Sequence, residues 1–122
     1  SLISDNNNQM NPKYSIQIYA KNNGREPFSE WVSGLDASIR GRIFARLDRV
    51  EQGNLGDWKP ISENLCELRF NFGAGYRIYF GRDKDTIIIL FSGGDKKTQR
   101  KDIEKAKSLW SEYERRKENE IV

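Results

Sequence analysis

The chain has 122 residues, with 21 Lys or Arg against 18 Asp or Glu, which gives a formal net charge of +3. This length suits one domain, and so small a charge excess means that any nucleic-acid role depends on where the cations lie. Histidine is absent and Cys66 is the single cysteine, which excludes an internal disulfide and argues against a metal site. We therefore expect no metal ion, no cofactor and a reducing, cytoplasmic location.

The first nine residues are rich in Asn and Asp. We expect residues 1–9 to be an unstructured tail or a remnant of cloning, and residues 10–122 to form the domain. The segment lacks the basic region and long apolar run of a signal peptide. No stretch of the sequence approaches the apolar length of a membrane span.

The predicted elements follow in chain order. Alternating apolar residues predict a strand at 14–20, and apolar spacings of three and four predict helices at 28–35 and 39–50. Gly53 ends the second helix, and residues 54–64 are predicted to be a loop. Three strands follow at 65–72, 75–82 and 86–93, joined by short hairpin turns, and a last helix begins near Thr98.

This order predicts an α+β fold. The three consecutive strands should form a twisted antiparallel meander, with the first strand of the chain along one edge. The two N-terminal helices should cover one face of that sheet. The other face is expected to be open, with the C-terminal helix following the last strand.

The alternation of side chains along the strands predicts what the open face displays. Glu67 and Arg69 on one strand, and Arg77 and Tyr79 on the next, should point away from the helices. The last strand runs into "SGGDKK", which is expected to be a flexible glycine turn. That turn can bring Lys96 and Lys97 to the rim of the same face, where arginines and lysines would converge on a phosphate.

Each of these residues also has a simpler interpretation that involves no phosphate. Asp95 or Thr98 caps the last helix, and the two lysines are merely solvated. Arg69 pairs with Glu67 or Asp83 on a wet sheet face. Within the predicted loop, Trp58 lies next to Lys59, a pair that could stack on a base and contact its phosphate.

Two stretches, "CELRFNFGAGYRIYF" and "IIILFSGGDKKTQRKDIEKA", resemble the RelE/ParE superfamily of toxins. Within it they are most similar to the HigB-like, phage Gp49-like group of addiction module killer proteins, over roughly Tyr14 to Tyr113. The resemblance implies a RelE-like fold and the toxin of a type II toxin–antitoxin system. It further implies an mRNA interferase, which cuts messenger RNA in the ribosome when a ribose 2′-OH attacks the adjacent phosphate.

The family's basic positions fall on Arg69, Arg77 and Lys96. A tyrosine of the RelE type would fall near Asp102, and the histidines of other HigB-like toxins are absent. A guanidinium does not give up its proton, so the arginines can only stabilise charge in the transition state. Proton transfer is left to Glu67 as base, and to Tyr79 or Lys96 as acid.

We expect the RNA and ribosome contacts to include Lys97, Lys59 and Trp58. The resemblance implies a cognate antitoxin, expected to be a helix-turn-helix protein, as a second partner. Two other functions stay open. One is inhibition of DNA gyrase by a ParE-like protein of the same fold, and the other is a noncatalytic RNA-binding domain.

Overall fold

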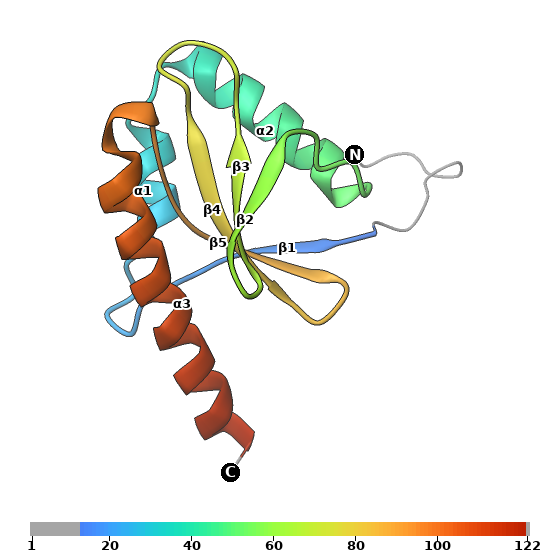
Figure 1. Ribbon diagram of the computed structural model, residues 1–122, viewed down its shortest axis with the longest axis vertical. Helices are drawn as coiled ribbons and strands as arrows, with labels where there is room; N and C mark the ends of the chain where they lie inside the picture. Colours follow the sequence, from blue (N-terminus) through green and yellow to red (C-terminus); the bar gives the residue numbers. More distant parts are fainter. Residues whose placement is uncertain (1–12, 122) are drawn as a thin grey trace.

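The computed structural model describes residues 13–121, so the prediction for residues 1–9 lies outside the described residues. Three helices and five strands form the fold (Figure 1). Their bounds are β1 Ser15–Ile18, α1 Pro27–Ser33, α2 Ala37–Glu51, β2 Trp58–Ser62, β3 Leu65–Arg69, β4 Arg77–Asp83, β5 Ile87–Gly94 and α3 Gln99–Ile121. Among these described helices, none has the length and apolar character needed to cross a membrane.

The strands form one sheet in the order β1-β5-β4-β3-β2. Strands β2 to β5 are an antiparallel meander, and β1 runs parallel to β5 at the edge, with Ser15 opposite Ile87. The predicted meander and the edge position of the first strand are confirmed. The predicted loop at 54–64 is wrong in part, because it contains β2. This strand is mostly exposed, includes Pro60 and has a bulge, so its sequence lacks the alternation that marks a half-buried strand.

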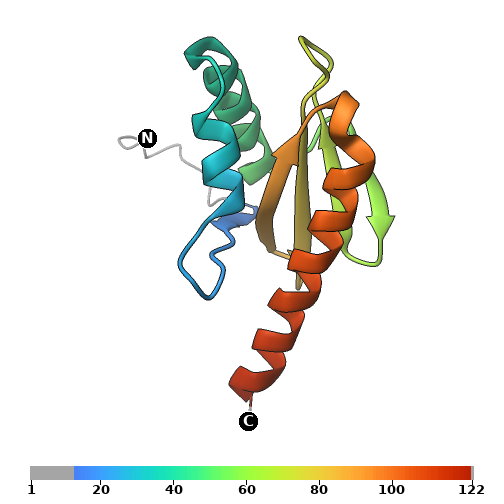
Figure 2. The same cartoon turned by 90° about the vertical axis from the view of Figure 1, so that its left-hand side faces the viewer.

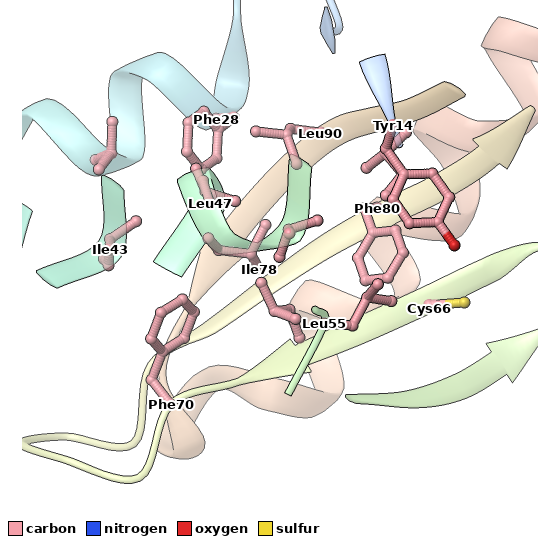
Figure 3. Packing of buried hydrophobic residues seen from close by; sticks show 14 residues of the cluster. Tyr14, Phe28, Ile43, Leu47, Leu55, Cys66, Phe70, Ile78, Phe80 and Leu90 are labelled. Atoms are coloured by element: carbon pink, nitrogen blue, oxygen red, sulfur yellow. The ribbon is translucent and has the colours of Figure 1, made fainter. Parts of the chain in front are cut away.

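Helices α1 and α2 cover one face of the sheet, as predicted. Ile43, Leu47 and Val50 recur at spacings of four and three along α2, which places them in one buried stripe. They pack with Phe28 of α1 and with inward-facing strand residues such as Ile78 (Figure 3). The groups in this layer are almost all apolar, so burial of hydrocarbon surface holds it together.

Helix α3 covers the opposite face, so the prediction of an open face is wrong. Figure 2 shows the sheet nearly edge-on, with α1 and α2 on one side and α3 on the other. Ala106 and Leu109 of α3 pack against Tyr79, Ile89 and Phe91. The apolar run of β5 alternates between the two cores, with Ile88 and Leu90 in the first. Such a continuous apolar strand needs cover on both faces.

Candidate nucleic-acid interface

The glycines that end β5 serve close packing, and the predicted flexible turn is wrong. Strand β5 continues through both of them, with Gly93 opposite Ile78 and Gly94 opposite Arg77. A Cβ on Gly93 would overlap the Trp31 indole, and a Cβ on Gly94 would overlap the carboxylate of Asp102 on α3. The missing side chains therefore let α1 and α3 close on the two faces of the same strand end.

The turn that follows is a helix cap. Asp95 accepts hydrogen bonds from the backbone N–H of Lys97 at 2.9 Å and of Thr98 at 3.2 Å, and Thr98 completes a capping box. A single 3₁₀ turn, Lys96–Thr98, then leads into α3. The capping alternative is thus confirmed for Asp95, and the cap fixes the backbone that carries Lys96.

Arg77 and Lys96 line one groove of about 460 Å³ at the end of the sheet. The remaining wall is the β3–β4 connection, residues 70–75. The backbone N–H of Lys96 donates to the Ala74 carbonyl at 3.3 Å, which joins the start of the α3 segment to this connection. Two of the predicted basic residues are thus brought together, although 18 residues separate their backbones along the chain.

Arg69 lies apart from this groove. It stands directly opposite Arg77 in the β3–β4 register, but its guanidinium pairs with Asp57 at 3.1 Å. The hydrogen bond from Arg69 holds the pKa of the Asp57 carboxyl below its usual range. The partners suggested by the sequence, Glu67 and Asp83, are wrong for Arg69. Asp57 was missed because it lies in the segment predicted as loop, whose pairing with β3 the sequence pattern did not indicate.

Glu67 and Tyr79 were expected on an open face of the sheet, but both are buried beneath α3. Glu67 is 1% exposed and accepts a hydrogen bond from Gln99 Nε2 at 2.7 Å. Its Oε2 also lies 3.8 Å from Arg77 Nε. Burial raises the pKa of the Tyr79 hydroxyl far above its usual value, and the nearby Glu67 carboxylate adds to that shift. The roles of Glu67 as base and Tyr79 as acid stay predictions that this burial does not favour.

The three predicted RNA-contacting residues are exposed but do not gather at the groove. Lys97 follows the Asp95 cap, and Lys59 and Trp58 lie on the edge strand β2. Trp58 is 38% exposed, with the Arg82 guanidinium 5.9 Å from its ring centroid. Their roles stay predictions.

A second depression, of about 350 Å³, adjoins the first along α2. It shares the wall at residues 70–72 and is lined by Arg42, Arg46 and Arg49. The Arg42 guanidinium lies 3.6 Å from the Phe72 ring centroid, a cation–π contact. These arginines were assigned no role from the sequence, but their spacings of four and three put them on one face of the helix, a signal that could have found them.

The five-stranded sheet with helices on both faces and Arg77 and Lys96 at one end is a small α+β architecture consistent with the RelE-like class. The family model described as "Phage derived protein Gp49-like (DUF891)" matches residues 30–111, so the chain belongs to the Gp49-like family. This is a toxin-like family related to the RelE/ParE type of addiction module. An uncharacterized protein of Haemophilus influenzae is 42% identical over 86 residues, which are 70% of this chain and 87% of that protein.

Proposed function

We propose that this protein is the toxin of a type II toxin–antitoxin system and acts as a HigB-like mRNA interferase on the ribosome. The observation that carries the proposal is the groove in which Arg77 and Lys96 meet. Membership of the Gp49-like family supports a toxin at the level of the family. The cytoplasm, where ribosomes are, would be the site of action.

The groove suits the phosphodiester of a single strand. A guanidinium presents parallel N–H donors that match two phosphate oxygens, and it keeps its charge at any physiological pH. Arg77 would stabilise the phosphorane-like transition state formed when the 2′-OH attacks. Lys96 would donate to the leaving 5′-oxygen, because this residue lines the same groove.

The side chains that line this groove include no carboxylate to accept the 2′-OH proton. We propose that in-line placement of the messenger by the ribosome supplies much of the rate, with the proton passing to a group outside this chain. Cleavage should then be strong only on translating ribosomes and weak on free RNA.

The lack of a carboxylate among the side chains that line the groove also agrees with a second function, the inhibition of DNA gyrase. A groove with cations and no proton acceptor would also serve an inhibitor that performs no chemistry, such as a ParE-like protein bound to DNA gyrase. It would serve a noncatalytic RNA-binding domain as well. The three functions differ in what the pure protein does to its target.

The deciding experiment has two parts. Programmed ribosomes are incubated with the protein and the message is mapped by primer extension, and separately gyrase is followed in a supercoiling assay. New 5′ ends on ribosome-bound message, with gyrase unaffected, are the expected result. Loss of supercoiling with intact message would replace the proposal by the gyrase inhibitor. Binding to RNA or ribosomes without cleavage would leave the RNA-binding domain.

Salt dependence tests the lysines separately. Each cation that replaces counterions at a phosphate contributes about 1 to the slope of log affinity against log salt. We expect a shallower slope for ribosome binding in Lys96→Ala/Lys97→Ala and an unchanged slope in the control Lys105→Ala/Lys107→Ala on exposed α3 positions. Equal slopes in both variants would remove the lysines from the interface.

A toxin needs a cognate antitoxin, for which we propose a helix-turn-helix protein that covers α3 and the Asp95 cap. An acidic surface on such a partner would speed its encounter with this mildly basic protein. Bound antitoxin should slow amide exchange between residues 93 and 116. Unchanged exchange rates in that segment would place the partner elsewhere.

A further inference from the structure

Beneath the first turn of α3 lies a buried polar layer whose hydrogen bonds are incomplete. Glu67, Tyr79 and Ser92 are each at most 2% exposed. Among the described residues, the buried side-chain atoms without a hydrogen-bond partner are Arg77 Nε, the Tyr79 hydroxyl and Ser92 Oγ. Burying such groups costs stability, and Arg77, one of the residues that carry them, lines the groove.

One atom stands at the centre of this layer. Glu67 Oε2 accepts the hydrogen bond from Gln99 Nε2 at 2.7 Å, and the same oxygen is the one 3.8 Å from Arg77 Nε. Gln99 is the first residue of α3, whereas Glu67 lies on β3 and Arg77 begins β4. A single carboxylate oxygen therefore connects the start of the C-terminal helix with the arginine of the groove.

Arg77 reaches from this layer into the groove. Its side chain is 11% exposed and its Nε is buried, yet it contributes to the groove wall together with Lys96. A carboxylate on the Nε side restrains rotation of the guanidinium plane and leaves the far nitrogens for a ligand. Glu67 is therefore placed where its charge could influence which way the guanidinium of Arg77 faces.

We propose that Glu67 is a positioning residue that orients the Arg77 guanidinium in the groove, and that Gln99 holds Glu67 in place for this task. The consequence for cleavage rests on the proposed function, whereas the orientation of Arg77 does not. Glu67 acts through Arg77 and touches no substrate.

A purely structural role for Glu67 makes different predictions. Arg69 and Arg77 stand directly opposite each other, and like charges in such a pair are destabilising. Asp57 already pairs with Arg69, so Glu67 could simply compensate the charge of Arg77, or tie α3 to the sheet. Buried ion pairs, however, are often no more stabilising than apolar residues of the same size. Experiments must therefore separate orientation from attachment of the helix.

The first experiment observes Arg77 directly and needs no activity. In ¹⁵N-labelled protein, the Arg77 Nε–H signal is assigned by its loss in Arg77→Lys. We expect slow proton exchange at this buried nitrogen in the unaltered protein. In Glu67→Gln the signal should shift and exchange should approach the rate of exposed arginines, with a smaller change in the same direction in Gln99→Ala. The matched controls Glu63→Gln and Gln52→Ala change exposed residues and should leave the signal unchanged.

The second experiment uses an exchange of the two side chains. The double variant Glu67→Gln/Gln99→Glu keeps the net charge and an amide–carboxylate pair between β3 and α3, but it moves the carboxylate off the strand. Its thermal midpoint should therefore stay near that of the unaltered protein, while the Arg77 signal stays altered. On programmed ribosomes, Glu67→Gln and the double variant should both lose kcat by roughly 10-fold or more with KM nearly unchanged, because misplacing a catalytic group is costly.

The outcomes separate cleanly. An Arg77 signal unchanged in Glu67→Gln overturns the proposal, and so does a double variant that regains both the signal and kcat. A Gln99→Ala variant that behaves like Gln52→Ala removes Gln99 from it. Absence of cleavage by the unaltered protein would refute the proposed function, and the Arg77 signal alone would then decide the positioning role.

Discussion

The two faces of the sheet are both buried, but they are built differently. The face under α1 and α2 is closed by apolar residues such as Ile43, Ile78 and Phe80. The face under α3 mixes apolar residues with the buried Glu67 and with hydroxyls that lack partners. The same strands supply both faces, since successive residues of β4 alternate between them.

The difference between the two faces shows which of them contributes most to stability and which contains groups that lower it. A buried polar atom without a partner costs on the order of 1–3 kcal/mol, and the described residues that carry such atoms lie on the α3 side. They lie next to the groove that holds Arg77 and Lys96. We interpret the first face as the support of the fold and the second as the layer that shapes the groove.

The largest effect is expected for Ile78→Ala. Ile78 is fully buried on the apolar face, so truncation should lower the free energy of unfolding by about 2–5 kcal/mol. Urea unfolding measures this. Ile18→Ala is the control, since Ile18 is 42% exposed, and it should cost within about 0.5 kcal/mol. A small decrease in the free energy of unfolding for Ile78→Ala would contradict the interpretation of the apolar face as the support of the fold.

Removal of Arg77 should impair the proposed cleavage more than folding. Arg77→Ala alone leaves the buried Glu67 charge without its partner, so the informative variant is Glu67→Gln/Arg77→Ala. We expect its cleavage on programmed ribosomes to fall by about 10² or more, as when one donor to a transition-state oxyanion is lost. Circular dichroism and the thermal midpoint report the fold. Full activity in a folded double variant would exclude Arg77 from the chemistry.

Gly94→Ala tests how tightly α3 closes on its face. The added methyl group would meet the Asp102 carboxylate, so we expect a loss of about 1–3 kcal/mol in the free energy of unfolding, as for other overpacked sites. Gly41→Ala is the opposite case, because a Cβ there has open space in the middle of α2. It should gain about 0.5–1 kcal/mol from helix propensity. Equal effects at both glycines would show that α3 packs loosely.

The smallest effect concerns the hydroxyl of Tyr79. The geometry gives this buried hydroxyl no hydrogen-bond partner, although the Glu67 carboxylate is near enough to raise its pKa, so Tyr79→Phe should leave stability unchanged or raise it by up to about 1 kcal/mol. Tyr113→Phe is the matched control, since its hydroxyl donates to Asp83. That variant should lose about 0.5–1.5 kcal/mol in the same unfolding measurement. A larger loss at Tyr79 than at Tyr113 would reveal a partner for the Tyr79 hydroxyl.

Much of the fold could be predicted from the sequence because the signals were local. The periodicity of α2 and the alternation in β3 and β4 identified these elements and assigned their residues to faces. The edge strand β2 could not be predicted, because pairing with β3 and not its own pattern makes it a strand. For the site, the outward phase of Arg77 and the basic turn at Lys96 were accessible from sequence. The spacing of Arg42, Arg46 and Arg49 along α2 could also have predicted that these arginines lie together on one face, but it was not used.

By itself, the sequence determined every helix and strand except β2, their order, the membership of the α+β class and the two cations that meet in the groove. Only the tertiary structure decided which charged side chains remain exposed and unpaired, and so able to contact a ligand. It placed α3 over the predicted open face, buried Glu67 and Tyr79, and paired Arg69 with Asp57. It also showed that Gly94 is a packing site. The physical reason is that periodicity reports which way a side chain leaves its own strand, whereas exposure and charge pairing depend on elements that are distant in the chain.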